Sequence, residues 1–99
     1  MLAITRKVDQ WVQIGQSIAV APTDIDAAAV RLIARGRVIG GADDGAAFET
    51  TADLAVGGEM RLGEHVVVTI LAIAGDEVRL GVQSPKHVRV DRKERADRK

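Results

Sequence analysis

The chain has 99 residues, and its fourteen basic and fourteen acidic residues leave no formal net charge. This length suits a single domain, and the balanced charge argues against indiscriminate binding to nucleic acid. The lack of cysteine excludes disulfides and thiolate metal sites, and no apolar stretch approaches the roughly 18–20 residues of a membrane span. We therefore expect a soluble cytoplasmic protein, and in the absence of any enzyme motif we expect no cofactor.

The charges are not spread evenly along the chain. Residues 1–39 carry a net charge of +2, residues 40–64 a net charge of −5 and residues 86–99 a net charge of +4. A neutral protein with this distribution can still present a local cationic surface. An anionic ligand is therefore expected near the two ends of the chain.

The first third of the chain reads as short strands. Residues 1–7 alternate as a strand does, and residues 10–14 and 17–21 are predicted as the next two strands, separated by Gly15-Gln16. Residues 23–36 are ambiguous, because an Asp N-cap, three alanines and a final Gly are signals of a short helix. An internal repeat, described below, predicts strands there. Since tertiary pairing overrides weak local propensity, we favour strands.

The middle of the chain contains a connector. Residues 40–47, GGADDGAA, are glycine-rich and polar and are interpreted as a linker, and residues 48–54 are predicted as the strand that follows it. Asp43-Asp44 lies within this linker. We interpret these two carboxylates as solubilising groups and not as a pair for acid–base chemistry.

Residues 60–92 are expected to form a meander of four short strands. The β-branched run at residues 65–73 predicts a buried strand, because stiff side chains of this kind favour sheets over helices. Ala74-Gly75-Asp76 supplies a tight turn, and residues 77–82 alternate as a half-buried strand does.

Ser84-Pro85 interrupts this meander, because proline has no backbone N–H to give to a ladder. Residues 86–92 resume the alternation and place Val88, Val90 and Arg92 on one face of a last strand. The remaining residues, 93–99, are almost wholly charged and are expected to form only a frayed helical turn or a tail.

The two halves of the chain match without gaps when the sequence is shifted by 48 positions. The matched pairs are Val8 and Val56, Ile14 and Leu62, Gly15 and Gly63, Ile18 and Val66, Val20 and Val68, Ile25 and Ile73, Val30 and Val78, Arg31 and Arg79, and Leu32 and Leu80. We interpret this as a tandem duplication with a first repeat at 1–39, a linker at 40–47 and a second repeat at 48–99. Chance matching of two β-rich stretches is the alternative. In the first repeat only Arg37-Val38-Ile39 remains of the last strand.

Both ends of the chain resemble the carbon storage regulator (CsrA/RsmA) family of bacterial RNA-binding proteins. The opening is similar to the family's M-L-x-L-T-R-[RK] strand and I-G turn, through Met1, Leu2, Ile4, Thr5, Arg6, Lys7 and Ile14-Gly15. The end is similar to the family's V-R-I-G-V-x-A-P-K-x-V-x-V-x-R-E-E run, through Val78-Arg79-Leu80-Gly81-Val82, Ser84-Pro85-Lys86, Val88, Val90, Arg92 and Glu94. The second pattern is the longer and more specific of the two.

The resemblance implies an all-β, mainly antiparallel fold. Members of the family are homodimers of five-stranded protomers with a C-terminal helix. This chain is then expected to be a single-chain pseudo-dimer of two five-strand units, the first lacking most of its last strand, with a short C-terminal helix. A monomer in solution is expected, although an exposed strand edge leaves self-association open.

The resemblance also implies a function, which is regulation of translation by binding GGA-containing loops in mRNA leaders. In the family each RNA site lies between the first strand of one protomer and the last strand of the other. Carried over to this chain, the RNA-binding residues are Ile4, Thr5, Arg6, Lys7, Val88, Val90 and Arg92. Arg6 and Arg92 are the expected guanidinium contacts. A regulatory small RNA and a protein antagonist are further implied partners.

The second site is expected to be inactive. Asp53 stands where the first repeat has Thr5, and Leu54 stands where it has Arg6. The last strand that would complete this site is also missing. Since phosphate binding depends on cations that release counterions, the acidic middle of the chain opposes RNA.

A different class of function remains as the alternative. The neutral overall charge is compatible with a protein-interaction module or decoy that keeps this fold without useful RNA affinity. Trp11 and Phe48, the two aromatic residues, are too few for a base-stacking platform, and Trp11 is interpreted as a packing residue. His65 and His87 are interpreted as surface residues and not as metal ligands or catalytic groups.

Overall fold

The computed structural model describes residues 1–93, which form an all-β protein without a helix. The strands within this part of the chain are β1 (Leu2–Lys7), β2 (Trp11–Ile14), β3 (Ile18–Ile25), β4 (Val30–Arg37), β5 (Ala47–Leu54), β6 (Glu59–Arg61), β7 (Val67–Ala74), β8 (Glu77–Gln83) and β9 (Val90–Lys93). The all-β prediction is therefore confirmed. The expected C-terminal helix or turn lies outside the described residues. No helix in the described part is long and apolar enough to cross a membrane.

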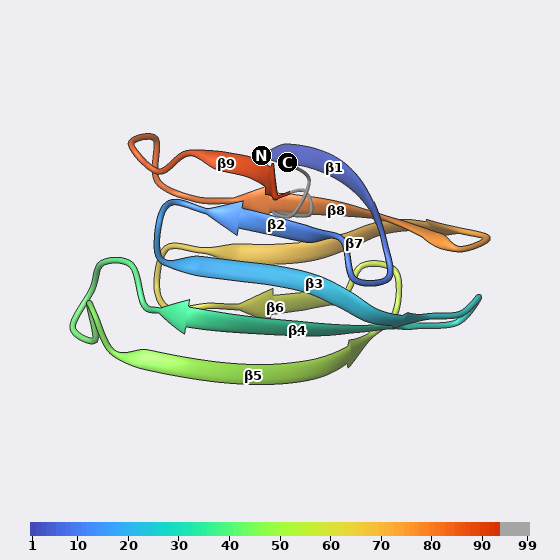
Figure 1. Ribbon diagram of the computed structural model, residues 1–99, viewed down its shortest axis with the longest axis horizontal. Coiled ribbons are helices and arrows are strands. Elements are labelled where there is room, and N and C mark those ends of the chain that lie inside the picture. Colours follow the sequence, from blue (N-terminus) through green and yellow to red (C-terminus); the bar gives the residue numbers. More distant parts are fainter. Residues whose placement is uncertain (94–99) are drawn as a thin grey trace, which may run out of the picture.

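The strands form two antiparallel sheets (Figure 1). Sheet A has the order β1-β8-β7-β6, and sheet B has the order β5-β4-β3-β2-β9. Strand β1 thus leaves its sequence neighbours and pairs with β8, while β9 pairs with β2 near the other end of the chain. Each sheet is built from both halves of the sequence.

The two central hairpins have the same register. Val20 pairs with Ala34 in the β3–β4 hairpin, and Val68 pairs with Val82 in the β7–β8 hairpin, 48 residues later on both strands. Each hairpin also contains one irregularity, after Pro22 in the first and at the position 48 residues later in the second. The offset found in the sequence is therefore also an offset of strand geometry.

The strands that flank these hairpins follow the same offset. Ile4 of β1 pairs with Leu80 of β8, and Ala52 of β5 pairs with Leu32 of β4. The first strand of each half is thus added to the sheet of the other half. This exchange leaves β1 and β5 as outer strands of different sheets.

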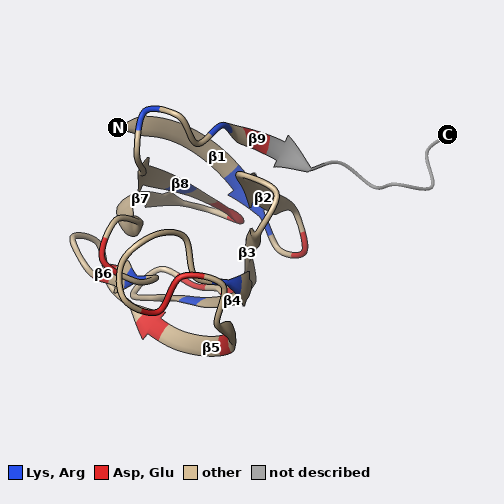
Figure 2. Ribbon diagram, turned by 90° about the vertical axis from the view of Figure 1, so that its left-hand side faces the viewer, with Lys and Arg blue, Asp and Glu red and all other residues tan. Residues whose placement is uncertain are grey.

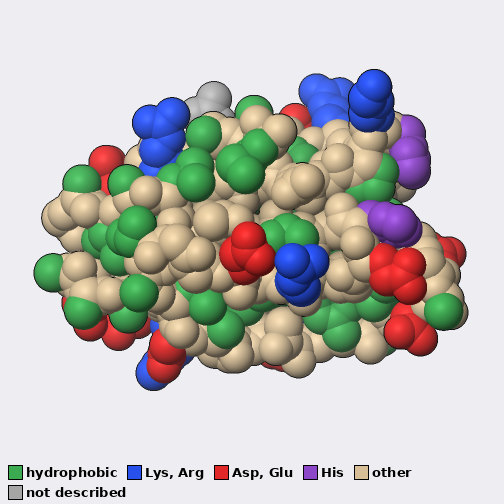
Figure 3. Space-filling view, turned by 180° about the vertical axis from the view of Figure 1, so that it is seen from behind, with side chains coloured by type: hydrophobic (Ala, Val, Ile, Leu, Met, Phe, Trp, Pro, Cys, Tyr) green, Lys and Arg blue, Asp and Glu red, His purple; other side chains and the backbone are tan. Residues whose placement is uncertain are grey.

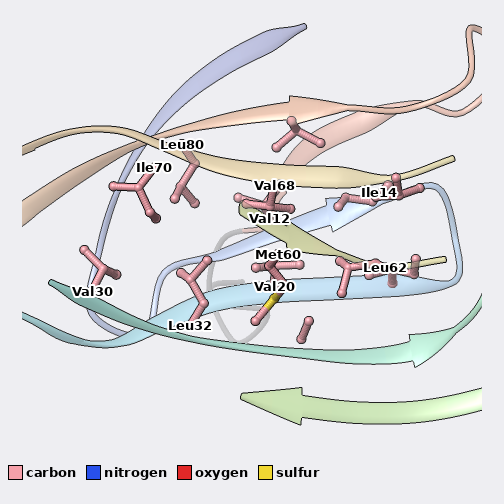
Figure 4. Close-up of a cluster of buried hydrophobic side chains, with 14 of the residues drawn as sticks. Val12, Ile14, Val20, Val30, Leu32, Met60, Leu62, Val68, Ile70 and Leu80 are labelled. Carbon is pink, nitrogen blue, oxygen red and sulfur yellow. The ribbon is translucent and has the colours of Figure 1, made fainter. Parts of the chain in front are cut away.

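One apolar core lies between the inner faces of the two sheets (Figure 4). Ile14 and Leu32 from sheet B, and Ile70 and Leu80 from sheet A, have no exposed surface. Full burial of a side chain of this size stabilises a fold by roughly 1.5–3 kcal/mol. Period-two alternation along each strand supplies these residues and leaves the polar ones outside.

The ambiguous segment at residues 23–36 is a β-hairpin, as the repeat predicted. Asp26 does not cap a helix; its Oδ1 accepts hydrogen bonds from the backbone N–H groups of Ala28 and Ala29, at 2.8 and 2.9 Å. The N–H of Asp26 donates in turn to the carbonyl of Ala29, at 3.0 Å. The side chain that signalled a helix start therefore closes a tight turn, which is a use that aspartate shares with helix caps.

Strand ends in the second half differ from the predicted ones. The strand expected at 65–73 begins at Val67, because residues 62–66 form a turn in which the Leu62 N–H donates to the Val66 carbonyl at 2.8 Å. The strand expected at 86–92 begins only at Val90. Before it, the Val88 N–H donates to the Pro85 carbonyl at 2.9 Å, so the proline starts a turn that uses part of the expected strand. The expected linker at 40–47 ends one residue early, since β5 begins at Ala47.

Candidate nucleic-acid interface

Strands β1 and β9 lie along the same side of the molecule, the upper side in Figures 1 and 2. Each is the last strand of its sheet, β1 beside β8 and β9 beside β2. Within the described residues each therefore has one edge that no other strand covers. Backbone N–H and C=O groups on such an edge are available to a ligand.

A shallow pocket of about 250 Å³ connects the two strands. It is lined by Met1, Leu2, Val82, Ser84, Pro85, Lys86, Val88 and Val90. Met1 is 75% exposed and Leu2 is 44% exposed, so the pocket offers apolar surface to solvent. Large apolar side chains exposed in this way are typical of binding surfaces.

Three expected site residues on β1 lie at its surface. Thr5 and Lys7 are exposed, and Ile4 is half-buried and packs against the core. The Lys7 Nζ lies 3.7 Å from Asp76 Oδ2, an ion pair between largely exposed side chains. Such a pair contributes little to stability, and its lysine can exchange the carboxylate for a phosphate at little cost.

Arg6 differs from the other expected contacts because it is buried, with only 5% of its surface exposed. Its Nε donates to the Thr5 carbonyl at 2.7 Å, and its Nη1 lies 3.4 Å from the Trp11 carbonyl. The guanidinium therefore joins β1 of sheet A to β2 of sheet B, the strand on which β9 is paired. In this position Arg6 fixes the two sides of the interface relative to each other.

The expected residues of the last strand lie opposite β2. The backbone of Arg92 pairs with Val12, and that of Val90 pairs with Ile14. Val88 and Val90 are half-buried, pack against the core and line the pocket that also contains Met1. The structure thus brings the valines of the C-terminal segment to the start of the N-terminal strand.

Basic groups surround this side of the molecule. Figure 3 shows basic side chains along the upper margin, the side of β1 and β9, and most acidic side chains below them. Lys86 and Arg89 are exposed in the turn that precedes β9. Arg89 also contacts Asp91, with 3.0 Å between Nε and Oδ2. A cationic margin next to apolar surface suits an anionic polymer with flat bases.

The equivalent position on β5 is chemically different. Arg79 pairs across the sheet with Thr5, whereas Arg31, 48 residues earlier, pairs with Asp53. The Arg31 Nε donates to Asp53 Oδ1 at 2.8 Å, and this hydrogen bond, together with the charge of Arg31, lowers the pKa of the Asp53 carboxyl. The arginine on this strand is thus already bound to an internal anion.

Sequence reasoning missed part of the pocket lining. Met1, Leu2, Pro85 and Lys86 were recognised as parts of the family patterns but not as site residues. Strand alternation selected the faces of β1 and β9, and it gave no information on the turn that brings residues 84–86 beside the chain start. In the described residues no group of three or more His, Cys, Asp or Glu is placed to hold a metal ion.

Comparison with known proteins identifies the second half of the chain. Residues 55–99 match the model of the CsrA family, described as a global regulator protein family. The second half is a CsrA-family sequence, and through it the chain belongs to the CsrA family. This CsrA-family half contributes β6, β7, β8 and β9, so the candidate interface joins it to β1, which lies outside the matched segment.

Several relatives of this CsrA-family chain are named translational regulator CsrA. The protein from Thermotoga maritima is 44% identical over 39 residues, which are 39% of this chain and 47% of that protein. The one from a Nocardioides species is 61% identical over 33 residues, 33% of this chain and 40% of that protein. The chain thus spans about half the length of the curated relatives it matches. No solved structure matches the chain.

Proposed function

We propose that this protein regulates translation in the cytoplasm by binding GGA-containing loops of mRNA leaders at one site, between β1 and β9. The observation that carries the proposal is the pocket shared by these strands, which joins the start of the chain to the CsrA-family half. The relatives' name, translational regulator, supports the same class of function.

In this proposal the site residues have different roles. Thr5, Lys7 and Arg92 contact the RNA, since hydroxyl, ammonium and guanidinium groups bind phosphates and base edges. The half-buried Ile4, Val88 and Val90 form the apolar floor beneath the bases. Arg6 acts as a positioning residue that holds β1 against β2.

We further propose that the chain is a monomeric pseudo-dimer with repeats at 1–39 and 48–99. The common register of the two hairpins and the exchange of β1 and β5 support this view. The position related to the RNA site is inactive in this proposal. Asp53 neutralises Arg31 there, and within the described residues no counterpart of β9 pairs with β6.

A gel-shift titration tests the RNA-binding proposal. A hairpin with GGA in its loop should bind, and the same hairpin with that loop triplet changed to CCA should bind more weakly. The affinity for the GGA hairpin should fall as the salt concentration rises, because cations on the protein displace counterions from phosphates. Equal affinity for the two hairpins, or no binding at low salt, would contradict the proposal and favour a protein-interaction module.

A further inference from the structure

The outer edge of β6 is the least explained feature of the molecule. Strand β6 pairs with β7 on one side, and within residues 1–93 no strand pairs with its other side. Its counterpart 48 positions earlier is β2, which has β3 on one side and β9 on the other. One of two equivalent edges is therefore paired and the other is open.

The hydrogen-bonding groups on this open edge can be identified. The Leu62 N–H donates to the Val66 carbonyl, at 2.8 Å, and thus points toward β7. Because directions alternate along an antiparallel strand, the N–H and C=O groups of Glu59 and Arg61 point the opposite way. On β2 the same parity is used: the N–H of Gly15, the counterpart of Gly63, donates to the Arg89 carbonyl at 2.6 Å.

The path of the chain explains why this edge is open. A Cβ on Gly15 would lie 3.2 Å from Val88 Cγ1, and a Cβ on Gly63 would lie 2.9 Å from Val38 Cγ1. Val38 thus occupies beside β6 the place that Val88 occupies beside β2. After Val88 the chain continues as β9. After Val38 it turns away through Gly40 and Gly41, both with positive φ (75° and 76°), and forms the connection to β5.

The surroundings of the open edge are hollow and acidic. A depression of about 400 Å³ lies beside it, lined in part by Glu59, Arg61, Glu64 and His65. The side chains of Glu59 and Glu64 are 47% and 65% exposed. Figure 3 shows acidic side chains near the histidines at one end of this face. Residues 40–64 together carry a net charge of −5. These features favour a basic occupant.

We propose that the outer edge of β6 binds an extended basic segment of another protein as an added antiparallel strand. The occupant has the chemistry of β9, in which β-branched residues alternate with charged, mainly basic ones. Main-chain hydrogen bonds to Glu59 and Arg61 provide affinity, and the acidic surroundings select positive charge. This site is separate from the proposed RNA interface and does not depend on it.

A second copy of this chain is a poorer occupant than a different protein. Each chain has one β9, which already pairs with its own β2. Donating it to the β6 edge of a neighbour would open the β2 edge of the donor, so the number of paired edges would not change. A partner that brings its own free strand gains the new hydrogen bonds without this loss.

The probe is a synthetic peptide with the sequence of residues 85–93, PKHVRVDRK, added to the full chain. Amide hydrogen exchange followed by NMR should show new protection at Glu59, Arg61 and Gly63, the residues whose N–H groups face the open edge. Protection at Trp11 and Gln13 alone would mean that the peptide replaces β9, and it would overturn the proposal. So would an absence of binding, or self-association of the chain that removes the open edge.

Two variants at one position test the mode of binding. Arg61→Pro removes an outward N–H while leaving the β6–β7 hydrogen bonds of Met60 and Leu62 in place, so the fold should persist. It should weaken peptide binding by about tenfold or more, since an added strand would lose a main-chain partner. The matched control, Arg61→Ala, keeps the N–H and should not weaken binding.

A charge variant keeps the test decisive if Arg61→Pro does not fold. Glu64→Lys reverses one exposed acidic group outside the β6–β7 ladder and should weaken binding of the basic peptide by a few fold at low salt. Its effect should shrink as salt is added. An affinity that is unchanged by Glu64→Lys and by salt would contradict the selection of a basic strand.

Discussion

Arg92 has the clearest expected role of any single residue. It lies on β9, the edge strand of the CsrA-family half, and its backbone is fixed opposite Val12. A planar guanidinium at such an edge can bind a phosphate or a guanine with two parallel hydrogen bonds. Its contribution should therefore exceed that of a basic residue placed elsewhere.

We predict that Arg92→Ala weakens binding of the GGA hairpin by roughly 1–3 kcal/mol, or about 10–100-fold. Fluorescence anisotropy with a labelled hairpin measures this change. The matched control is Arg31→Ala, which removes the same charge from a strand whose arginine is bound to Asp53. Similar losses in the two variants would indicate a general effect of charge and remove Arg92 from the site.

The pair of Arg31 and Asp53 can be tested by titration. The hydrogen bond from Arg31 lowers the pKa of Asp53 in the folded protein, so the pair stabilises the fold above the unfolded-state pKa of Asp53. That contribution is lost as the pH falls through the lower, folded-state pKa. We predict that Arg31→Ala raises the pKa of Asp53 toward its ordinary value, as measured by NMR of the carboxyl carbon. An unchanged pKa would show that the pair does not persist in solution.

At the scale of elements, the sequence predicted strands better than it predicted turns. Period-two alternation and β-branched runs located every strand expected in the first half, and the offset of 48 decided between helix and hairpin at residues 23–36. Turn chemistry was the weaker guide, because aspartate caps helices and turns alike. Proline at position 85 was correctly interpreted as a break, but the length of the turn that follows it depends on where β9 meets β2.

Gly36 shows how one turn position constrains an element. It was interpreted as a helix stop, but it ends β4 with a φ of 140°, and a Cβ there would overlap the Ser17 carbonyl. We predict that Gly36→Ala lowers the free energy of unfolding by roughly 1–3 kcal/mol, measured by urea denaturation.

Gly45 provides the control for this substitution. Its φ is also positive, at 85°, but a Cβ there would meet nothing within 4 Å. Gly45→Ala should therefore have the smaller effect. If the two variants lose equal stability, then the backbone conformation alone matters, and the close approach of Ser17 does not.

At the scale of the whole molecule, the candidate site depends on contacts between distant parts of the sequence. The residue types of the site could be predicted from the two terminal patterns. Their grouping could be expected only through the family resemblance, because strand exchange between halves leaves no local signal. The burial of Arg6 could not be predicted either, since alternation placed it on an exposed face and only the proximity of the Trp11 carbonyl accounts for its orientation.

The pseudo-dimer proposal makes its sharpest prediction about stoichiometry. Two complete sites would let one chain bind two hairpins, or hold two sites of one RNA with the gain in effective concentration that linkage provides. This chain has β9 beside β2 and an open edge at β6, and Asp53 occupies the position equivalent to Thr5. We therefore predict saturation at one hairpin per chain in calorimetry, with a monomeric mass by light scattering.

Restoring cationic chemistry on β5 should not by itself create a second site. The double variant Asp53→Thr, Leu54→Arg gives β5 the residues that β1 has at positions 5 and 6, yet β6 still has no strand of the β9 kind beside it. Because an RNA site of this kind needs both strands, the variant should still saturate at one hairpin. Saturation at two hairpins by the unmodified chain would contradict the one-site proposal, and saturation at two by the variant alone would show that β5 is sufficient for binding.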